Sequence, residues 1–172
     1  MKDKRKIIII LSGLAIAAAV FIFAGKDAEK VFPAFASKSL EGQDVTDALF
    51  AEKKLTMVNI WTTWCPPCIG EMPDLGNLAK TMPEGSQLVG IILDADEPGA
   101  LDDALKILED ANASFVQILP ADSMGPVLSM VEAIPTTIFV DSAGNIVGNP
   151  LVGARPENAY RAEIDKLLKS LQ

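Results

Sequence analysis

The chain has 172 residues, two cysteines and no histidine, so its length suits one domain with an appendage and excludes two large domains. Without histidine, Ser-His-Asp and Cys-His catalysis are excluded, as are zinc sites that use Cys and His ligands. Residues 1–30 carry six basic and three acidic side chains, which leaves nine basic and twenty acidic ones in the other 142 residues, an acidic balance that argues against nucleic acid as a partner.

The N-terminus has the pattern of a membrane anchor. Four of the first six residues are basic, and residues 7–24 carry no charge. As a helix this run would be about 27 Å long, close to the ~30 Å hydrocarbon core of a bilayer. The basic flank predicts a cytoplasmic N-terminus, with the later residues outside. We predict a signal anchor over 1–25, a linker over 26–30 and a domain over 31–172.

Signal-peptide cleavage, which would give a secreted protein, is the alternative to this anchor. The uncharged run is longer than the ~7–15 residues usual for a signal peptide, and Ile22 and Ala24 make a poor cleavage site. A buried core helix is disfavoured because the run has no amphipathic face. The anchor therefore predicts a single-pass protein of the cell membrane with its domain extracytoplasmic.

The rest of the chain has the pattern of a mixed α/β domain. Apolar runs rich in β-branched residues predict strands, and apolar residues at helical spacing predict helices, with Pro73 expected to kink the first of these. Turn residues 41–43 and 141–145 predict two hairpins. This order implies a central mixed sheet covered on both faces. Strands are expected at 31–35, 44–46, 55–61, 88–93, 115–119, 136–140 and 146–151, and helices at 66–82, 100–111 and 156–171.

An acidic stretch before the second helix partly matches a calcium-binding loop through Asp94, Asp96 and Gly99. Pro98 takes a ligand position, and Leu105 stands where the bidentate Glu belongs. We therefore interpret this stretch as a solvated loop that leads into the helix.

Both cysteines lie directly after a predicted strand, at the start of a predicted helix. The helix N-terminus favours a thiolate at Cys65 and lowers its pKa. Cys68 lies one turn into the helix, where it can attack a mixed disulfide formed on Cys65. Pro66 and Pro67 have no N–H, so donors to the thiolate must come from Cys68 onward.

Three other interpretations of this pair remain open. A structural disulfide would close a loop of only four residues and stabilise the fold by roughly 2 kcal/mol. A Cu(I) site fits two thiolates, but neither His nor Met stands beside them. A peroxidase could use Thr62, three residues before Cys65, but the expected proline is Val58.

The segment Trp61 to Cys68, WTTWCPPC, resembles the thioredoxin active site, with Pro73 further along the helix. Residues 133–139, AIPTTIF, are similar to the cis-proline loop of that superfamily, and 152–154, VGA, precede the last helix. Together with the early hairpin, the helix and strand at 100–119 and the anchor, these motifs resemble the TlpA/ResA-like extracytoplasmic thiol-disulfide oxidoreductases. The resemblance covers about residues 31–171.

This resemblance implies a thioredoxin-like fold with an N-terminal hairpin and a helix-strand insertion. It implies a redox-active Cys65–Cys68 disulfide without a further cofactor or metal, and a cis Pro135 against the cysteines. It also implies substrate contacts at Trp64, Pro66, Pro67 and Ile134.

Two polar positions bear on proton transfer. Cytoplasmic thioredoxins carry a buried Asp where this chain has Asn59, and Asn cannot accept a proton at neutral pH. Glu71, three residues after Cys68, matches a Glu typical of the TlpA/ResA-like family and is the candidate for the proton of Cys68. The alternative is a solvated carboxylate in the first turn of the helix.

The resulting hypothesis is a membrane-anchored enzyme that reduces disulfides in exported proteins, with apocytochrome c or a reductase among the candidate substrates. A membrane thiol carrier would supply the electrons. The cytochrome c maturation branch often has Gly-x-Pro-Glu-Thr where this chain has residues 133–137, AIPTT. The alternatives are a disulfide oxidant or isomerase, and a binding module with an inert disulfide.

Overall fold

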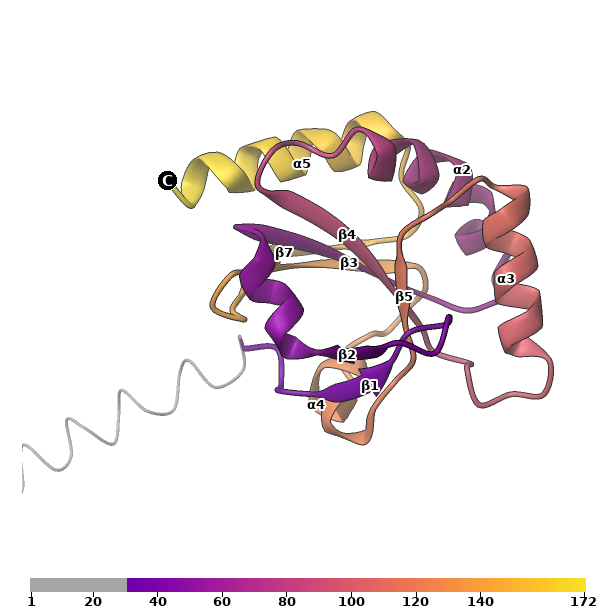
Figure 1. Ribbon diagram of the computed structural model, residues 1–172. Helices are drawn as coiled ribbons and strands as arrows, with labels where there is room; N and C mark the ends of the chain where they lie inside the picture. Colours follow the sequence, from indigo (N-terminus) through magenta and orange to yellow (C-terminus); the bar gives the residue numbers. More distant parts are fainter. Residues whose placement is uncertain (1–30) are drawn as a thin grey trace, which may run out of the picture. The chain divides into compact units, whose positions relative to one another are not determined.

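Five strands form the central sheet of the computed structural model, which describes residues 31–172 (Figure 1). Their spatial order is β5-β4-β3-β6-β7. The β3–β4 and β4–β5 pairs are parallel, whereas β3–β6 and β6–β7 are antiparallel, so the sheet is mixed as predicted. The strands are β3 (Leu55–Trp61), β4 (Ser86–Ile92), β5 (Val116–Ile118), β6 (Thr136–Asp141) and β7 (Ile146–Val152).

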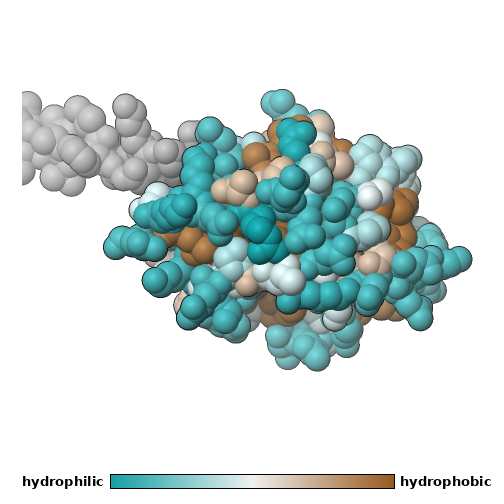
Figure 2. Space-filling view, turned by 90° about the horizontal axis from the view of Figure 1, so that it is seen from above, coloured by the Kyte–Doolittle hydropathy of each residue, from teal (hydrophilic) through white to brown (hydrophobic). Residues whose placement is uncertain are grey.

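Helices cover both faces of this sheet. In Figure 1, α2 and α5 lie over one face, and the hairpin β1–β2 and α4 lie on the other side. The α-helices are α2 (Pro66–Lys80), α3 (Ala100–Asp110), α4 (Gly125–Leu128) and α5 (Glu157–Ser170), and the 3-10 helices are η2 (Asp47–Glu52) and η3 (Asp122–Met124). Figure 2 shows the face above the sheet as mostly hydrophilic, with separate hydrophobic patches.

Strand β3 lies at the centre of two hydrophobic clusters. Successive side chains of a strand point to opposite faces. Met57 and Trp61 therefore pack with residues of α2 and α5, while Val58 and Ile60 pack with residues of the hairpin side. All seven residues of β3 are buried, which explains why its predicted bounds are correct. The active-site segment thus follows a strand that is held from both sides.

The N-terminal hairpin pairs β1 (Ala36–Lys38) with β2 (Asp44–Thr46). The first strand was predicted at 31–35, which is wrong by several residues. Pro33 lacks an N–H for a ladder, and both Phe32 and Phe35 are buried. Their rings pack edge to face with that of Phe50, at centroid distances of 5.1 and 6.1 Å.

The hairpin also bonds to strand β5 at the edge of the main sheet. Leu40 N donates to Gln117 O at 2.8 Å, and Leu119 N donates to Lys38 O at 2.9 Å. A bridge between Ser39 and Ile118 completes this contact. The outer side of β5 is therefore covered by backbone partners.

Other boundaries differ from the predictions by a few residues. Helix α2 ends at Lys80 instead of 82, because Thr81 forms its C-cap and Pro83 follows. The short elements η2, η3 and α4 were not predicted. The predicted anchor over 1–25 and linker over 26–30 lie outside the described residues, and within 31–172 no helix is long and apolar enough to cross a membrane.

Candidate active site

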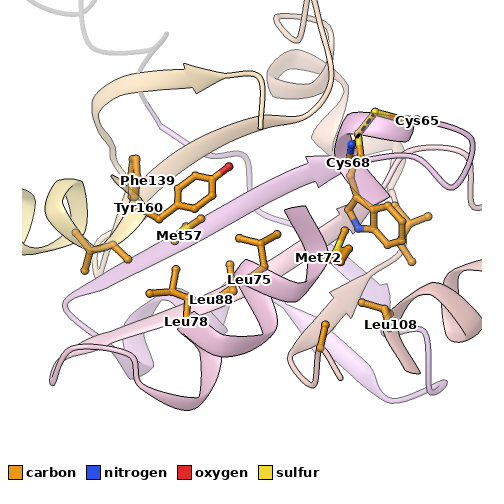
Figure 3. Packing of buried hydrophobic residues seen from close by; sticks show 14 of the residues in the cluster. Met57, Cys65, Cys68, Met72, Leu75, Leu78, Leu88, Leu108, Phe139 and Tyr160 are labelled. Carbon is orange, nitrogen blue, oxygen red and sulfur yellow. Dashed lines mark hydrogen bonds between the residues drawn. A yellow bond between two sulfur atoms is a disulfide. The ribbon is translucent and has the colours of Figure 1, made fainter. Parts of the chain in front are cut away.

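The two cysteines form a disulfide at the start of α2, shortly after the end of β3 (Figure 3). Cys65 is the N-cap of α2, and its Sγ accepts a hydrogen bond from Cys68 N at 3.2 Å. Pro66 and Pro67 fill the first two helical positions, where prolines are tolerated because the N–H groups of the first turn have no intrahelical partner. Local sequence therefore places both sulfur atoms at the helix start, as predicted.

The disulfide is buried beneath an exposed rim. Cys65 keeps 3% of its surface exposed and Cys68 keeps none. Pro66 and Pro67 are exposed, and Trp64 is 68% exposed beside them. Of the residues assigned to substrate contact, these three are accessible to a protein partner.

The loop before β6 closes the other side of the disulfide. The Ile134–Pro135 peptide bond is cis, as the resemblance implied. Ile134 O lies 3.8 Å from Cys65 Sγ, a contact and not a hydrogen bond, because a disulfide sulfur has no proton to donate. Gly153 N donates to Pro135 O at 2.8 Å, so the residue that follows β7 (Ile146–Val152) holds this loop in place. Ile134 is thus brought to Cys65 from 69 positions along the chain, and Pro135 is the residue that follows it.

Glu71 is buried, so its interpretation as a solvated first-turn carboxylate is wrong. Its Oε2 accepts hydrogen bonds from Tyr160 Oη at 2.7 Å and from Arg155 N at 3.1 Å. Its Oε1 accepts one from Asn59 Nδ2 at 2.9 Å. Among the described residues, none of its hydrogen bonds goes to a cysteine sulfur. Glu71 is therefore held by α5 and β3 one turn beyond Cys68.

Burial dominates the electrostatics of this cluster. Burial raises the pKa of the Glu71 carboxyl above its ordinary value, and the hydrogen bonds from Tyr160, Asn59 and Arg155 N oppose this rise without cancelling it. Burial, followed by the charge of Glu71, raises the pKa of Tyr160, so its hydroxyl stays protonated and acts as the donor. The site thus holds a carboxyl that gains a proton more readily than a solvated Glu.

Asn59 connects this cluster to the cis-proline loop. Its Nδ2 also donates to Thr137 Oγ1 at 3.2 Å, two residues after Pro135. Its Oδ1 has no hydrogen-bond partner among residues 31–172. If Glu71 takes a proton, rotation of the Asn59 amide would turn Oδ1 toward it as an acceptor, so Asn59 can match either charge state of Glu71.

Asp94 is also buried, which corrects its interpretation as part of a solvated loop. Its Oδ2 accepts hydrogen bonds from Thr63 N at 3.0 Å and from Thr63 Oγ1 at 2.6 Å. Thr63 lies two residues before Cys65. A buried carboxylate needs donors, and this one finds them in the active-site turn.

Thr63 and Thr137 belong to the site although neither was predicted to, and Tyr160 was predicted only as a core residue. A signal for Tyr160 was present, because a tyrosine at a core position of a helix needs a partner for its hydroxyl. For the two threonines the sequence holds no signal, since their partners, Asp94 and Asn59, lie far away in the chain.

The mixed sheet, the buried Cys65–Cys68 disulfide at a helix start and the cis-proline loop beside it define a thioredoxin-fold thiol-disulfide oxidoreductase. A family model described as Redoxin matches residues 26–168, and the chain belongs to this family. Together with the DsbE and ResA relatives described next, this match confirms the predicted TlpA/ResA-like relationship and the enzyme class.

Relatives with related names are similar over most of their length. The chain is 29% identical to the thiol:disulfide interchange protein DsbE of Pseudomonas aeruginosa, over 98% of this chain and 96% of that one. It is 30% identical to the thiol-disulfide oxidoreductase ResA of Oceanobacillus iheyensis, over 84% and 81%. It is 32% identical to a DsbE homolog of Paracoccus denitrificans, over 79% and 74%.

Solved structures share the fold. A thioredoxin-family thiol:disulfide interchange protein from Chlorobium tepidum has a TM-score of 0.66 at 24% identity, covering 80% of this chain and 94% of that one. StoA from Bacillus subtilis has a TM-score of 0.62 at 23% identity, covering 77% and 97%. The thioredoxin-like fold with its mixed central sheet, predicted from sequence, is thereby confirmed.

Proposed function

We propose that this protein reduces disulfides in exported proteins outside the cytoplasmic membrane, with Cys65 and Cys68 as the dithiol. The Cys65 thiolate attacks a sulfur of the substrate disulfide and releases one substrate thiol. The Cys68 thiolate then attacks Cys65 and releases the second, leaving the protein disulfide. Two electrons and two protons pass to the substrate, and a membrane thiol carrier restores the dithiol by the reverse exchange.

The donors at Cys65 are the observation that best supports the reducing direction. An N-cap side chain accepts hydrogen bonds from the second or third helical residue. Here the second is Pro67, which has no N–H, and Cys68 N is the one backbone donor to Cys65 Sγ among the described residues. A thiolate with fewer donors is less stable, so the disulfide is a weaker oxidant.

The reduction potential tests this direction. Equilibration with glutathione should give a value nearer thioredoxin's ~-270 mV than the ~-120 mV of a strong oxidant. A value above about -180 mV would favour the oxidant or isomerase alternative.

A matched pair of variants isolates the cause. Pro67→Ala restores an N–H at the second helical position and should raise the potential. Pro66→Ala restores one at the first position, outside the capping geometry, and should change it little. Equal shifts in the two variants would contradict the assigned role of the missing donor.

Glu71 is the proposed group for the proton of Cys68. A buried carboxyl with a raised pKa, one turn along the same helix, takes up a proton more readily than a solvated Glu, which suits a proton acceptor. We assign substrate contact to the exposed Trp64, Pro66 and Pro67 and to Ile134 at the cis-proline loop.

Trapping identifies the substrates. A Cys68→Ser variant keeps Cys65 but has no resolving thiol, so mixed disulfides with exported proteins should accumulate. Cys65→Ser is the control, because the buried Cys68 should trap few partners. If reduced Cys65 fails to react with iodoacetamide, the disulfide is inert and the binding-module alternative holds.

The membrane location rests on residues 7–24. Retention of this segment would hold the domain beside a membrane electron donor, where tethering raises the effective concentration. Mass spectrometry of the mature protein should find the segment intact in the membrane fraction. A mature N-terminus after Ala24 would replace the anchor with a secreted form and leave the dithiol chemistry unchanged.

A further inference from the structure

Strands β3 and β4 are parallel and stay paired up to their last residues, Trp61 and Ile92. The last ladder contact is Leu93 N to Trp61 O at 2.9 Å. Beyond it, the chain after β3 turns toward Cys65 and the chain after β4 reaches Asp94. The Asp94 carboxylate joins these two segments by accepting hydrogen bonds from Thr63.

The Asp94 side chain accepts its hydrogen bonds from a single residue, Thr63. Asp94 Oδ2 accepts from both Thr63 N and Thr63 Oγ1, and Oδ1 lies 3.2 Å from the same nitrogen. Asp94 is 7% exposed. Within residues 31–172, all of its side-chain hydrogen bonds come from Thr63. A buried carboxylate with one partner fixes the position of that partner, because any movement of Thr63 leaves the carboxylate without donors.

Thr63 occupies the centre of the active-site turn. The carbonyl of Thr62 accepts from Cys65 N at 3.5 Å, and Trp64, on the other side of Thr63, is exposed. The position of this turn sets where Cys65 Sγ lies between Cys68 N and Ile134 O. The contact between Asp94 and Thr63 thus links the segment after β4 to the turn that carries Cys65.

We propose that Asp94 is a positioning residue for Cys65, which acts by holding Thr63 and thereby the turn that presents the sulfur to Cys68 N. The proposal rests on the thiol-disulfide chemistry of the family and is independent of the direction of electron flow. If the potential contradicts the reducing role, the dependence of Cys65 on Asp94 is unaffected.

The test measures alkylation of Cys65 by iodoacetamide in the reduced full-length protein across pH 5 to 10. Asp94→Ala removes the contact, so Cys65 loses alignment with its N–H donor. Its alkylation at pH 7 should fall by roughly three- to tenfold, and the pH of half-maximal rate should rise. Wild-type ellipticity in the near ultraviolet shows that the fold is retained.

Asp94→Asn separates position from charge. An amide oxygen in the place of Oδ2 keeps both short contacts to Thr63, so this variant should stay within about twofold of the wild type. Thr63→Val removes the hydroxyl, so its rate of Cys65 alkylation should lie between the rates of Asp94→Ala and the wild type. Thr63→Ser keeps the hydroxyl, so its rate should equal that of the wild type. Asp96→Ala removes an exposed carboxylate two residues along the same loop and is the matched control.

Two results would overturn the proposal. One is a wild-type pH profile in Asp94→Ala. The other is an equal acceleration of alkylation in Asp94→Ala and Asp94→Asn, which would mean that the charge matters and the contact does not. If Asp94→Ala does not fold, the test rests on Thr63→Val and Thr63→Ser. A pH profile of alkylation in Thr63→Val that equals that of the wild type would then be sufficient to contradict the proposal.

Discussion

The hydroxyl of Tyr160 donates a 2.7 Å hydrogen bond to Oε2 of Glu71, and so ties the last helix of the domain to the helix that begins at the disulfide. Both groups are buried, and they are 89 positions apart in the chain. This bond favours the ionised carboxylate, in opposition to burial. Tyr160 therefore makes Glu71 take a proton less readily, against the larger effect of burial.

Tyr160→Phe should raise the pKa of Glu71 further, because the carboxylate loses a donor. If Glu71 handles the proton of Cys68, the pH profile for resolution of a mixed disulfide should move to higher pH. Stopped-flow measurement from pH 5 to 9 checks this shift. Ile164→Val, a buried change one turn along α5, should cost about 1 kcal/mol and leave the profile in place.

Glu71→Gln should slow resolution of mixed disulfides by at least about tenfold, because an amide cannot accept the proton. The fold should persist, since the Asn59 amide can rotate to accept from the new side-chain N–H. Single-turnover rates across pH 5 to 9 provide the measurement. Rates equal to those of the wild type would remove Glu71 from the mechanism.

The same substitution should alter how stability depends on pH. The pKa of Glu71 is raised in the folded state, so between the ordinary value of 4.5 and the raised value the folded protein keeps a proton that the unfolded chain has released. The free energy of unfolding of the wild type should therefore fall, relative to Glu71→Gln, as pH rises through this window, and the difference should then level off. Urea unfolding of both proteins at pH 4 to 8 checks the sign. A difference that grows in favour of the wild type would mean that the folded pKa is lowered.

Asn59→Asp should place a second carboxyl at hydrogen-bonding distance from Glu71 Oε1. Two carboxylates this close cannot both ionise readily, so the pair should retain a shared proton at neutral pH. We expect a stability loss that is roughly 1–3 kcal/mol larger at pH 8 than at pH 5. Urea unfolding at the two pH values measures it, and Asn77→Asp on the exposed side of α2 is the control. A pH-independent loss would point to packing instead of charge.

Gly90→Ala tests the contact that orients Trp61. A Cβ at Gly90 would overlap the side chain of Gln117, whose Oε1 accepts from Trp61 Nε1 at 3.0 Å. Displacement of Gln117 leaves a buried donor unpaired, so we expect a loss of about 2–4 kcal/mol in the free energy of unfolding. Gly125→Ala, where an added Cβ meets no atom within 4 Å, should change stability little. A loss below about 0.5 kcal/mol at Gly90 would mean that Gln117 moves freely.

The elements whose bounds were predicted correctly are those that depend on residues close together in the sequence. Strand β3 is a continuous apolar run that is buried on both faces, so its pattern gives its bounds. The helix start at the cysteines follows from two prolines after an N-cap. The first strand of the hairpin was misplaced because its position depends on bonds to β5, about 80 residues away.

The same distinction separates the parts of the site. The pattern of the cysteines and of Pro135 is local, and a family resemblance is enough to place them together. Glu71 and Asp94 are carboxylates, and Asp and Glu side chains are mostly exposed to solvent in folded proteins. Their burial depends on Arg155, Tyr160 and Thr63, which lie 31 to 89 positions away and leave no periodic signal.

The hairpin that bonds to β5 also bears on how copies of this protein meet one another. An uncovered edge strand offers a row of N–H and C=O groups on which another chain can stack and begin an aggregate. At one edge of the sheet the hairpin occupies those groups. At the other edge, β7 contains Pro150, which has no N–H, and Gly148 at a φ of 70°. Within residues 31–172 neither edge of the sheet therefore offers the continuous row of free N–H and C=O groups on which another strand could stack.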